Sequence, residues 1–381
     1  MSDLEIQEVD SVHIKIRCER SVAKELSEFF TFTVPNYQYT PAFKNKLWDG
    51  QIRLYNLHTQ QLYAGLLEYV YGFAKDRNYT ITSEIKRSKS SITNKDIDGF
   101  ISNKLKPTVN GSRIQPHKHQ LESIAHAINN ERCLLLSPTG SGKSLIIYSL
   151  IRYYEDILPK DKKILIVVPT TGLVSQMYND FGDYSSKVDW NVDDKCHSIY
   201  AGQDKVTEKR VVISSWQSIY KLPDKYFSQF GAVFGDECHL FKSKSLTTLM
   251  SKLKACKYRI GTTGTLDGTN THKLVIEGLF GRVYNVTTTT ELIKEKLLSK
   301  LEIDCICLQY PKEDIEEIKR AKYQDEIKWI ISNKKRNKFI EGLCGKLKGN
   351  TLLLFNFVEN HGKPLFENIR SLYPDRKVFF I

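Results

Sequence analysis

The sequence predicts an α/β fold built on a parallel sheet, with a small α+β domain before it. Three observations support this prediction. Between residues 113 and 300, continuous apolar runs alternate with amphipathic segments of helical length, as in a sheet covered by helices on both faces. The preceding residues mix short alternating runs with one helical pattern. The residues after 300 begin the α/β alternation again, and we expect there the start of a second domain of the same kind.

The small α+β domain is expected to span residues 1–105. SVHIKIRC (11–18) alternates apolar and polar residues, which is typical of a half-buried strand. SVAKELSEFF (21–30) has apolar residues at helical spacing. WDGQIRLYN (48–56) combines a turn with a second alternating strand.

The N-terminal region is locally basic. Between residues 44 and 113 there are twelve Lys or Arg and six Asp or Glu, and aromatic side chains are interleaved with them. Such a mixture can bind phosphates and stack bases. A small core with a solvated rim has the same composition, and spacing alone favours it. The prediction of a nucleic-acid-binding domain therefore depends on the resemblance described below.

A second domain is expected over residues 106–300. Its predicted helices include KSLIIYSLIRYYEDIL (143–158). Its predicted strands are CLLLS (133–137), KILIVVP (163–169), RVVISS (210–215), GAVFGD (231–236) and YRIGTTG (258–264).

The third stretch, residues 301–381, is expected to be an incomplete α/β domain. Strands are predicted at LEIDCICLQY (301–310), TLLLFNFV (351–358) and KVFFI (377–381), with helical stretches between them. A nucleotide-binding fold of this type needs about five strands, so we expect a truncated domain. Cys305 and Cys307 would share one strand face, and we expect buried thiols there.

Composition excludes several classes of protein. The 381 residues are 41% hydrophobic and 26% charged, which is a globular mixture. No stretch approaches the roughly 18 apolar residues of a membrane span, and the acidic start is not a signal peptide, so we expect an intracellular protein without membrane contact. The eight cysteines include no CxxC pair, which argues against zinc or a disulfide framework. The net charge of +12 favours a polyanionic partner, although a solvated basic surface explains it equally well.

The strongest local motif is SPTGSGKS (137–144), between a predicted strand and a predicted helix. It departs from the usual phosphate loop only at Ser137. Its glycines allow backbone N–H groups to converge on phosphate oxygens, Lys143 would bridge the β- and γ-phosphates, and Ser144 would bind Mg²⁺. The predicted nucleotide-binding residues are Pro138, Thr139, Gly140, Ser141, Gly142, Lys143 and Ser144.

An acidic pair follows another apolar strand in GAVFGDECHLF (231–241). Asp236 would hold Mg²⁺ through water, and Glu237 would orient and deprotonate the attacking water. His239 would face the next domain. Asp-Glu at a strand end can also be a solvated turn, but two strands after a phosphate loop it predicts the second half of an ATPase site.

Taken together, the motifs resemble those of superfamily 2 helicases with a DExH box, over roughly residues 113–381. IQPHKHQ resembles an upstream element whose glutamine, here Gln120, reads adenine. The resemblance implies a RecA-like first motor domain, an incomplete second one, and ATP and Mg²⁺ as cofactors.

The same resemblance extends to nucleic-acid contacts and coupling. VPTTGLVSQ is similar to motif Ia, SSWQS to a segment that touches the nucleic-acid backbone, GTTGT to motif III and TLLLFNFVENHG to motif IV. Thr263 and Thr265 would couple hydrolysis to strand movement, although they are also ordinary strand-end hydroxyls. The implied nucleic-acid contacts are Pro169, Thr170, Thr171, Ser215, Trp216 and Gln217.

FKNKLWDGQIRLYN and the residues around DECHLFKSKS further resemble the UvsW helicases of T-even-like phages, as does YQDEIKWIISNKKRNKFI. This resemblance implies a monomer in the host cytoplasm that remodels branched or forked DNA and RNA–DNA hybrids in R-loops, during phage replication, recombination and repair. The family's arginine finger belongs to motif VI. Motifs V and VI are absent from these residues, so we expect ATP and DNA binding with slow hydrolysis and no unwinding.

Alternative functions remain open from the sequence. One is the motor subunit of a restriction system, although no nuclease or methyltransferase segment is visible. An RNA helicase of the DEAD type fits less well, because motif II is DECH and motif III is GTTGT. A third is a nucleic-acid-binding module in which ATP acts as a switch without productive turnover.

Overall fold

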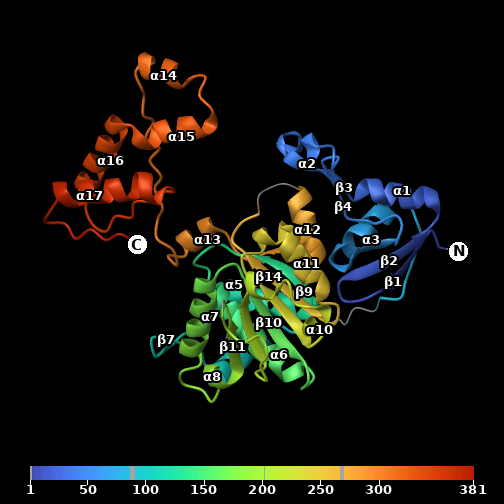
Figure 1. Cartoon of the computed structure of the whole chain (residues 1–381). Helices are drawn as coiled ribbons and strands as arrows, with labels where there is room; N and C mark the ends of the chain where they lie inside the picture. Colours follow the sequence, from blue (N-terminus) through green and yellow to red (C-terminus); the bar gives the residue numbers. More distant parts are fainter. Residues whose placement is uncertain (1, 86–90, 201, 267–269) are drawn as a thin grey trace. The chain divides into compact units, whose positions relative to one another are not determined.

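The computed structural model describes residues 2–85, 91–200, 202–266 and 270–381, and it confirms the α/β class with a parallel sheet (Figure 1). The chain divides into two compact units, Met1–Lys300 and Leu301–Ile381. In the part of the chain that the structure describes, no helix is both long and apolar enough to cross a membrane.

The larger unit is built around a seven-stranded parallel sheet with the order β11-β12-β10-β13-β14-β9-β15. Five of its strands lie where the apolar runs predict them. The edge strands β11 and β15 were not predicted, because segments of four and three residues carry too little pattern. The strands are β9 (Arg132–Leu136), β10 (Lys163–Val168), β11 (Cys196–Ile199), β12 (Val211–Ser215), β13 (Phe230–Gly235), β14 (Tyr258–Thr263) and β15 (Val283–Asn285).

Helices cover both faces of this sheet, as the continuous apolar strands require. Successive residues of one strand enter different cores: Ile164 and Ile166 join one cluster, whereas Leu165 joins the other. The first face carries α5 (Lys118–Asn130), α6 (Lys143–Ile157) and α7 (Thr171–Tyr184). The second carries α9 (Trp216–Ile219), α10 (Asp224–Phe227), η4 (Cys238–Lys242), α11 (Lys244–Lys252) and α12 (Asn270–Phe280). The short helix α8 (Val192–Lys195) packs on the first core through Val192, and the short helix α13 (Thr289–Lys294) contributes to neither core.

The N-terminal residues form a four-stranded sheet with the order β5-β2-β1-β6, and β1 pairs antiparallel with β2 and parallel with β6. A separate hairpin, β3 with β4, carries a short insert. The elements are β1 (Leu4–Glu8), β2 (His13–Cys18), α1 (Arg20–Phe29), β3 (Thr31–Thr33), η1 (Tyr37–Tyr39), α2 (Pro41–Lys44), β4 (Gln51–Arg53), β5 (Gln61–Tyr63), η2 (Ala64–Leu66), α3 (Leu67–Asp76) and β6 (Ile81–Ser83). Towards the larger sheet follow α4 (Asn94–Phe100), the π-helix η3 (Ile101–Leu105), β7 (Thr108–Val109) and β8 (Ser112–Arg113).

The two sheets of the larger unit are joined through close backbone contacts. A Cβ on Gly65 in η2 would lie 2.1 Å from the carbonyl oxygen of Glu277, so only glycine allows α12 to approach this closely. The hydroxyl of Tyr69 donates to the buried carboxylate of Glu277 at 2.7 Å. Residues 2–85 are therefore packed firmly against the domain that carries the parallel sheet.

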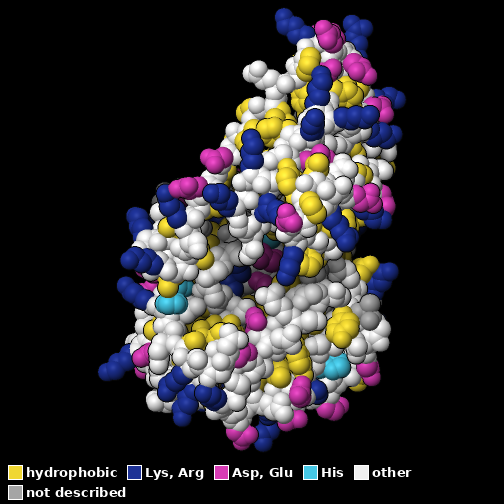
Figure 2. Space-filling model, turned by 90° about the vertical axis from the view of Figure 1, so that its left-hand side faces the viewer, with side chains coloured by type: hydrophobic (Ala, Val, Ile, Leu, Met, Phe, Trp, Pro, Cys, Tyr) yellow, Lys and Arg dark blue, Asp and Glu magenta, His cyan; other side chains and the backbone are white. Residues whose placement is uncertain are grey.

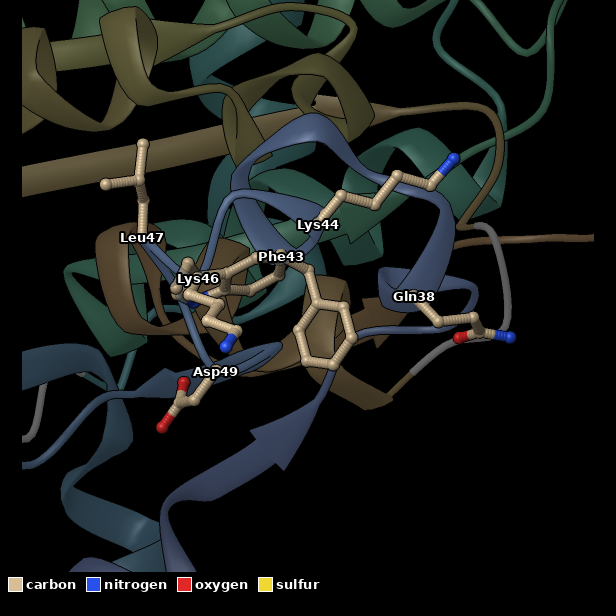
Figure 3. A pocket seen from close by; sticks show the side chains of 7 residues that line it. Gln38, Phe43, Lys44, Lys46, Leu47 and Asp49 are labelled. Atoms are coloured by element: carbon tan, nitrogen blue, oxygen red, sulfur yellow. The ribbon is translucent and has the colours of Figure 1, made fainter.

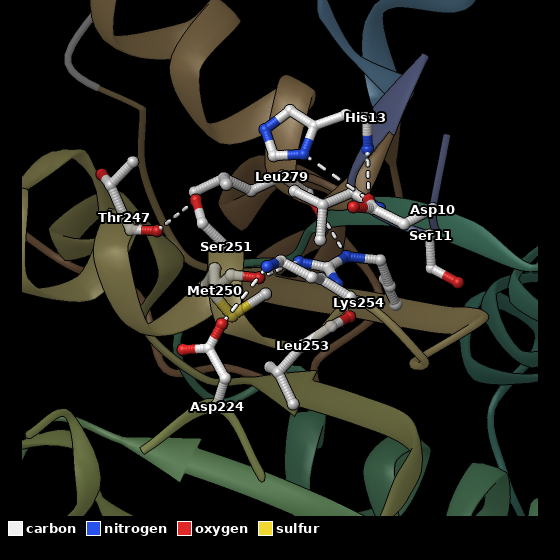
Figure 4. A network of polar contacts seen from close by, with 12 residues as sticks. Asp10, Ser11, His13, Asp224, Thr247, Met250, Ser251, Leu253, Lys254 and Leu279 are labelled. Carbon is white, nitrogen blue, oxygen red and sulfur yellow. Dashed lines mark hydrogen bonds and ion pairs between the residues drawn. The ribbon is translucent and has the colours of Figure 1, made fainter. Parts of the chain in front are cut away.

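A polar network supports the same junction (Figure 4). The carboxylate of Asp10 accepts from the N–H of His13 at 2.8 Å, and the N–H of Ser11 donates to the carbonyl of Lys254 at 3.0 Å. Beneath it, the fully buried guanidinium of Arg259 donates to three backbone carbonyls, those of Met250, Leu253 and Leu279. Arg259 thereby joins β14 to the ends of α11 and α12.

The smaller unit contains helices but no strand, so the strand predictions at 301–310, 351–358 and 377–381 are wrong. The predicted burial of Cys305 and Cys307 is also wrong, since both are exposed. Phe355 and Phe380 stack at 5.5 Å, yet their backbones form no ladder, and a strand exists only where a neighbour completes its hydrogen bonds. The helices are α14 (Lys312–Ile318), α15 (Tyr323–Ser332), α16 (Lys334–Lys346), the π-helix η5 (Val358–Gly362) and α17 (Lys363–Leu372).

Candidate nucleotide and nucleic-acid site

The phosphate loop connects β9 to α6, and two left-handed glycines shape it. Gly140 has a φ of +83° and Gly142, the N-cap of α6, has a φ of +81°. Both positions are also crowded: a Cβ on Gly140 would lie 2.6 Å from Leu298, and one on Gly142 would lie 2.2 Å from the Gln120 amide. Glycine is therefore favoured at both positions. The loop brings backbone N–H groups together at the N-terminal end of α6, where the helix dipole is positive.

Hydrogen bonds inside the loop hold its shape. The Ser141 hydroxyl donates to the carbonyl of Pro138 at 2.7 Å and lies 2.5 Å from the Ser137 hydroxyl. The ammonium of Lys143 donates to the carbonyl of Ser137 at 3.3 Å, so this cation lies within the loop. The departure from the usual motif at Ser137 thus supplies a hydroxyl that supports the loop. Sequence reasoning had no signal for this role.

Ser144, the predicted Mg²⁺ ligand, faces α7. Burial raises the pKa of Asp180 above its ordinary value, and a hydrogen bond from Ser144 opposes that rise. Burial likewise raises the pKa of Tyr184 to about 12. Asp180 was not predicted as a site residue, because only the packing of α7 on α6 brings it to the loop.

Gln120 supports the loop directly. Its side-chain amide donates to the carbonyl of Ser141 at 3.0 Å, and its side-chain oxygen accepts from the N–H of His117 at 2.8 Å. His119 contacts the same Ser141 carbonyl at 3.0 Å. A cavity of about 330 Å³ beside the loop has room for a nucleobase and is lined by Ile114, Gln115, His117, Gln120, Gly142, Leu145 and Tyr184. Gln120, which was predicted to read the base, therefore lines a cavity. Tyr184 lines the same cavity, and the sequence motif did not indicate it.

The acidic pair follows β13, and β14 lies between β13 and β9. The carboxylate of Asp236 is largely buried and accepts from the Thr262 hydroxyl at 2.7 Å. Glu237 has a left-handed φ of +51°, which is uncommon for a residue other than glycine. Thr262 is a missed residue. No short segment of the sequence indicated it, because Thr262 meets Asp236 only through the pairing of β13 with β14, in which Gly235 lies opposite Gly261.

His239 links the acidic pair to the residues predicted to couple hydrolysis to movement. Its Nδ1 atom lies 3.3 Å from a carboxylate oxygen of Glu237 and 3.1 Å from the Thr263 hydroxyl. Thr263 in turn donates to the carbonyl of Thr265 at 3.0 Å, and its own carbonyl accepts from the N–H of Ser137 at 2.8 Å. The phosphate loop, the acidic pair and the GTTGT segment are thus connected by hydrogen bonds.

The site is suited to a phosphate-bound, hydrated cation. In the described residues, no group of three or more His, Cys, Asp or Glu gathers where it could hold a metal. Mg²⁺ in nucleotide sites usually takes one or two protein oxygens together with phosphates and water. The hydroxyl of Ser144 and the carboxylate of Asp236 match that donor set, and the glycine-lined loop matches the phosphates.

The predicted nucleic-acid residues follow two neighbouring strands, since β10 pairs with β12 up to Val168 and Ser215. Gln217 joins the segments by donating to the carbonyl of Pro169 at 3.1 Å. Thr170 caps α7 by accepting from the N–H of Leu173. The exposed members of the set are Thr170, Thr171 and Gln217.

The other members of the set are less available. Ser215 is buried, with its hydroxyl 2.9 Å from that of Ser218, and Trp216 is half-buried against Tyr220. Figure 2 shows Lys and Arg spread over the visible face among Asp and Glu rather than gathered in one patch. The distribution of basic side chains on that face therefore does not indicate where a nucleic acid would bind.

Family models match the chain in two places. One described as "DNA helicase UvsW, N-terminal" matches residues 3–84, and one described as "Type III restriction enzyme, res subunit" matches residues 113–268. The DNA 3'-5' translocase XPB2 of Sulfurisphaera tokodaii is 24% identical over 40% of this chain and 31% of its own length.

Similarity to one relative extends over the whole chain. The ATP-dependent DNA helicase uvsW of Enterobacteria phage T4 is 35% identical over 100% of this chain and 75% of its own length. A crystal structure of T4 UvsW aligns with a TM-score of 0.68 at 34% identity, over 97% of this chain and 73% of that one. A second UvsW structure from the same phage gives a TM-score of 0.67 over 74% of this chain and 99% of that one. The chain therefore belongs to the UvsW family of helicases, which are ATP-hydrolysing enzymes.

Proposed function

We propose that this chain is an ATP-dependent DNA helicase that remodels branched or forked DNA and RNA–DNA hybrids. The observation that carries the proposal is the connection from the phosphate loop to Glu237. Hydrogen bonds join the loop to Thr263 and Thr263 to His239, and His239 lies 3.3 Å from the carboxylate of Glu237. A site that only bound nucleotide would need the loop after β9 and the acidic pair after β13, but no link to Thr263 at the end of β14. The relative in phage T4 bears the name of a DNA helicase, which supports the same conclusion.

ATP would lie with its phosphates in the loop and its base in the neighbouring cavity. Lys143 would turn from the Ser137 carbonyl to the β- and γ-phosphates, and Gln120 and Tyr184 would border the adenine. Mg²⁺, held by Ser144 and through water by Asp236, would neutralise phosphate charge. Glu237 would orient the attacking water and accept its proton.

Hydrolysis would reach the DNA through the hydroxyls of the GTTGT segment. A change in charge at the γ-phosphate alters the surroundings of Glu237, and His239, which contacts Glu237, passes that change to Thr263. The Thr263 hydroxyl, which donates to the carbonyl of Thr265, extends it to that residue. Thr170, Thr171 and Gln217 would hold one strand through its phosphates, which gives affinity without sequence preference. Residues 301–381 would belong to the second motor domain. No residue there is assigned as an arginine finger.

We further propose that the chain acts as a monomer in the cytoplasm of a phage's host. The restriction-subunit alternative is supported by the match over residues 113–268, whereas the UvsW similarity extends over the whole chain. The nucleic-acid switch without turnover remains the alternative that an experiment must exclude.

The test compares ATP hydrolysis and DNA remodelling on a fork, on a linear duplex and without DNA. On this proposal we expect fork-stimulated hydrolysis with fork regression, and this result would overturn the expectation, drawn from the sequence, of slow hydrolysis without unwinding. In Glu237→Gln, ATP still binds but hydrolysis and remodelling are lost. Remodelling that persists in Glu237→Gln, or a chain whose DNA affinity responds to ATP without any turnover, would contradict the motor and favour the switch.

A further inference from the structure

A small folded insert projects from the N-terminal domain between β3 and β4. It spans Val34–Gly50, and we call it the hairpin insert. The N–H of Val34 donates to the carbonyl of Gly50 at 2.8 Å and closes its base. The nucleotide site described above uses none of its residues.

Aromatic packing gives the hairpin insert a fixed shape. Gly50 has a φ of +81°, and a Cβ there would lie 2.2 Å from the ring of Tyr37. Tyr37 meets Phe43 edge to face at 4.7 Å, and the indole N–H of Trp48 donates to the carbonyl of Gln51 at 2.8 Å. Binding of a ligand to this insert therefore costs little conformational entropy, because the insert is already ordered.

The hairpin insert carries an open cavity of about 640 Å³ (Figure 3). It is lined by Gln38, Phe43, Lys44, Lys46, Leu47, Trp48 and Asp49. Leu47 is 81% exposed. Nearby Tyr39 is 70% exposed.

The charges around the cavity leave two free cations. Asp49 pairs with Arg53, and this hydrogen bond lowers the pKa of the Asp49 carboxyl. Lys44 and Lys46 are exposed and form no ion pair with the residues that the structure describes. The cavity thus offers apolar and aromatic walls beside two ammonium groups that are available to an anion.

A nucleotide whose base is unpaired matches this chemistry. Its base has an apolar face for Phe43 and Leu47, and its flanking phosphates are anions for Lys44 and Lys46. In duplex DNA the base faces are stacked and hidden, so the match is to DNA where pairing is interrupted. Since residues 2–85 pack firmly on the motor domain and β3 lies against α12, the hairpin insert stands at a fixed position relative to the motor site.

We propose that the hairpin insert is a second DNA-binding site, which holds an unpaired nucleotide at a branch point. This inference rests on the proposed function, because it explains how a motor that grips one strand through phosphates distinguishes a branch from a linear duplex. The base packs on Phe43 and Leu47, and its phosphates contact Lys44 and Lys46.

The test uses the full chain and a forked DNA that carries 2-aminopurine at the branch. The double variant Lys44→Gln, Lys46→Gln removes both cations, and Leu47→Ser removes the apolar contact without changing charge. The matched control is Lys24→Gln, Lys75→Gln, two exposed lysines of the same domain on α1 and α3. Affinity for forked, linear and single-stranded DNA is measured at several salt concentrations.

The cation variant is expected to lose about tenfold in affinity for forked DNA, and its slope of log affinity against log salt falls by about 1.4, or about 0.7 for each phosphate contact. Leu47→Ser loses the fluorescence change of 2-aminopurine. The control keeps the fork affinity and the fluorescence change, and all variants keep the ATP hydrolysis measured without DNA.

Equal weakening by the cation variant and the control would overturn the proposal, since charge alone would then explain binding. Unchanged fork affinity in the cation variant and in Leu47→Ser would overturn it in favour of a protein partner for the cavity. If the unaltered chain binds a fork no more tightly than a linear duplex, the proposed function fails. The proposal for the hairpin insert is then tested with single-stranded DNA alone. It is contradicted if the cation variant has the same salt slope there as the unaltered chain.

Discussion

Two regions of this chain have similar sequences and different structures. CLLLSPTGSGKS (133–144) and TLLLFNFVENHGKP (351–364) each place an apolar run before a Gly-Lys pair that begins a helix. The first is β9, the phosphate loop and α6. The second has no strand, and Gly362 has a helical φ of −63° where Gly142 has +81°.

The surroundings explain this difference. β9 lies between β14 and β15, so both of its edges are hydrogen-bonded and Leu135 is fully buried. Leu352 and Leu354 are 79% and 81% exposed, and no strand lies beside them in the described residues. An apolar run therefore sets the tendency to form a strand, and neighbouring strands decide whether one forms.

The largest expected effect separates the two Gly-Lys pairs. Lys143→Ala removes the cation inside the phosphate loop and is expected to lower ATP hydrolysis by about 10²–10³-fold, because a preorganised charge at the phosphates is lost. Lys363→Ala is the matched control: Lys363 pairs with Glu359 on an exposed helix start, and hydrolysis should stay within about twofold. Steady-state phosphate release measures both. A similar loss in both variants would mean that 351–364 also takes part in catalysis.

The next largest effect concerns the buried contacts that Arg259 of β14 makes with the ends of α11 and α12. Arg259→Met is expected to lower the free energy of unfolding by about 3 kcal/mol or more, because three buried carbonyls lose their donor. Lys257→Met, which removes the more exposed ion pair to Glu131, should cost under about 1 kcal/mol. Urea unfolding followed by circular dichroism measures both. A small cost for Arg259→Met would show that α11 and α12 do not depend on this contact.

A leucine in each apolar run tests the comparison directly. Leu135→Ala is expected to cost about 2–5 kcal/mol, since it leaves a cavity in a packed core. Leu354→Ala should change stability by no more than about 0.5 kcal/mol, because its side chain is exposed. The same urea experiment applies. If both changes lower the free energy of unfolding by the same amount, the apolar run at 351–358 is buried in solution. The contrast between the two apolar runs would then be wrong.

The smallest effect concerns pH. Burial of Glu155 on α6 raises the pKa of its carboxyl above the ordinary 4.5, even though Trp190 and Arg152 oppose the rise. Between 4.5 and the raised pKa the folded chain binds more protons than the unfolded chain, so stability falls as pH rises through that interval. Glu155→Gln keeps an acceptor for Trp190 and is expected to flatten this decline. Unfolding measured from pH 4 upward checks the slope, and an unchanged slope would contradict the assignment.

Much of the first motor domain could be predicted because its signals are local. The five central strands were read from continuous apolar runs, and Gly140 and Gly142 from a motif whose backbone only glycine adopts easily. The strands predicted after residue 300 failed for the opposite reason. Their apolar residues are of the same kind, but pairing depends on segments far away in the sequence.

The site shows the same division. Asp236 and Lys143 were predicted from residue type and spacing, whereas Thr262, Asp180 and Tyr184 were not. Thr262 meets Asp236 because β14 lies beside β13, and Tyr184 reaches the base cavity because α7 packs on α6. Sheet order and helix packing are not encoded in any short window.

The sequence by itself therefore determined the α/β class, the phosphate loop and the acidic pair, because backbone freedom, charge and hydrophobic periodicity act within a few residues. Only the tertiary structure decided which strands are neighbours, that Gln120 supports the loop, and that the hairpin insert stands at a fixed position relative to the motor. Those arrangements arise from contacts between segments that burial brings together, and their free energy depends on the whole packed unit.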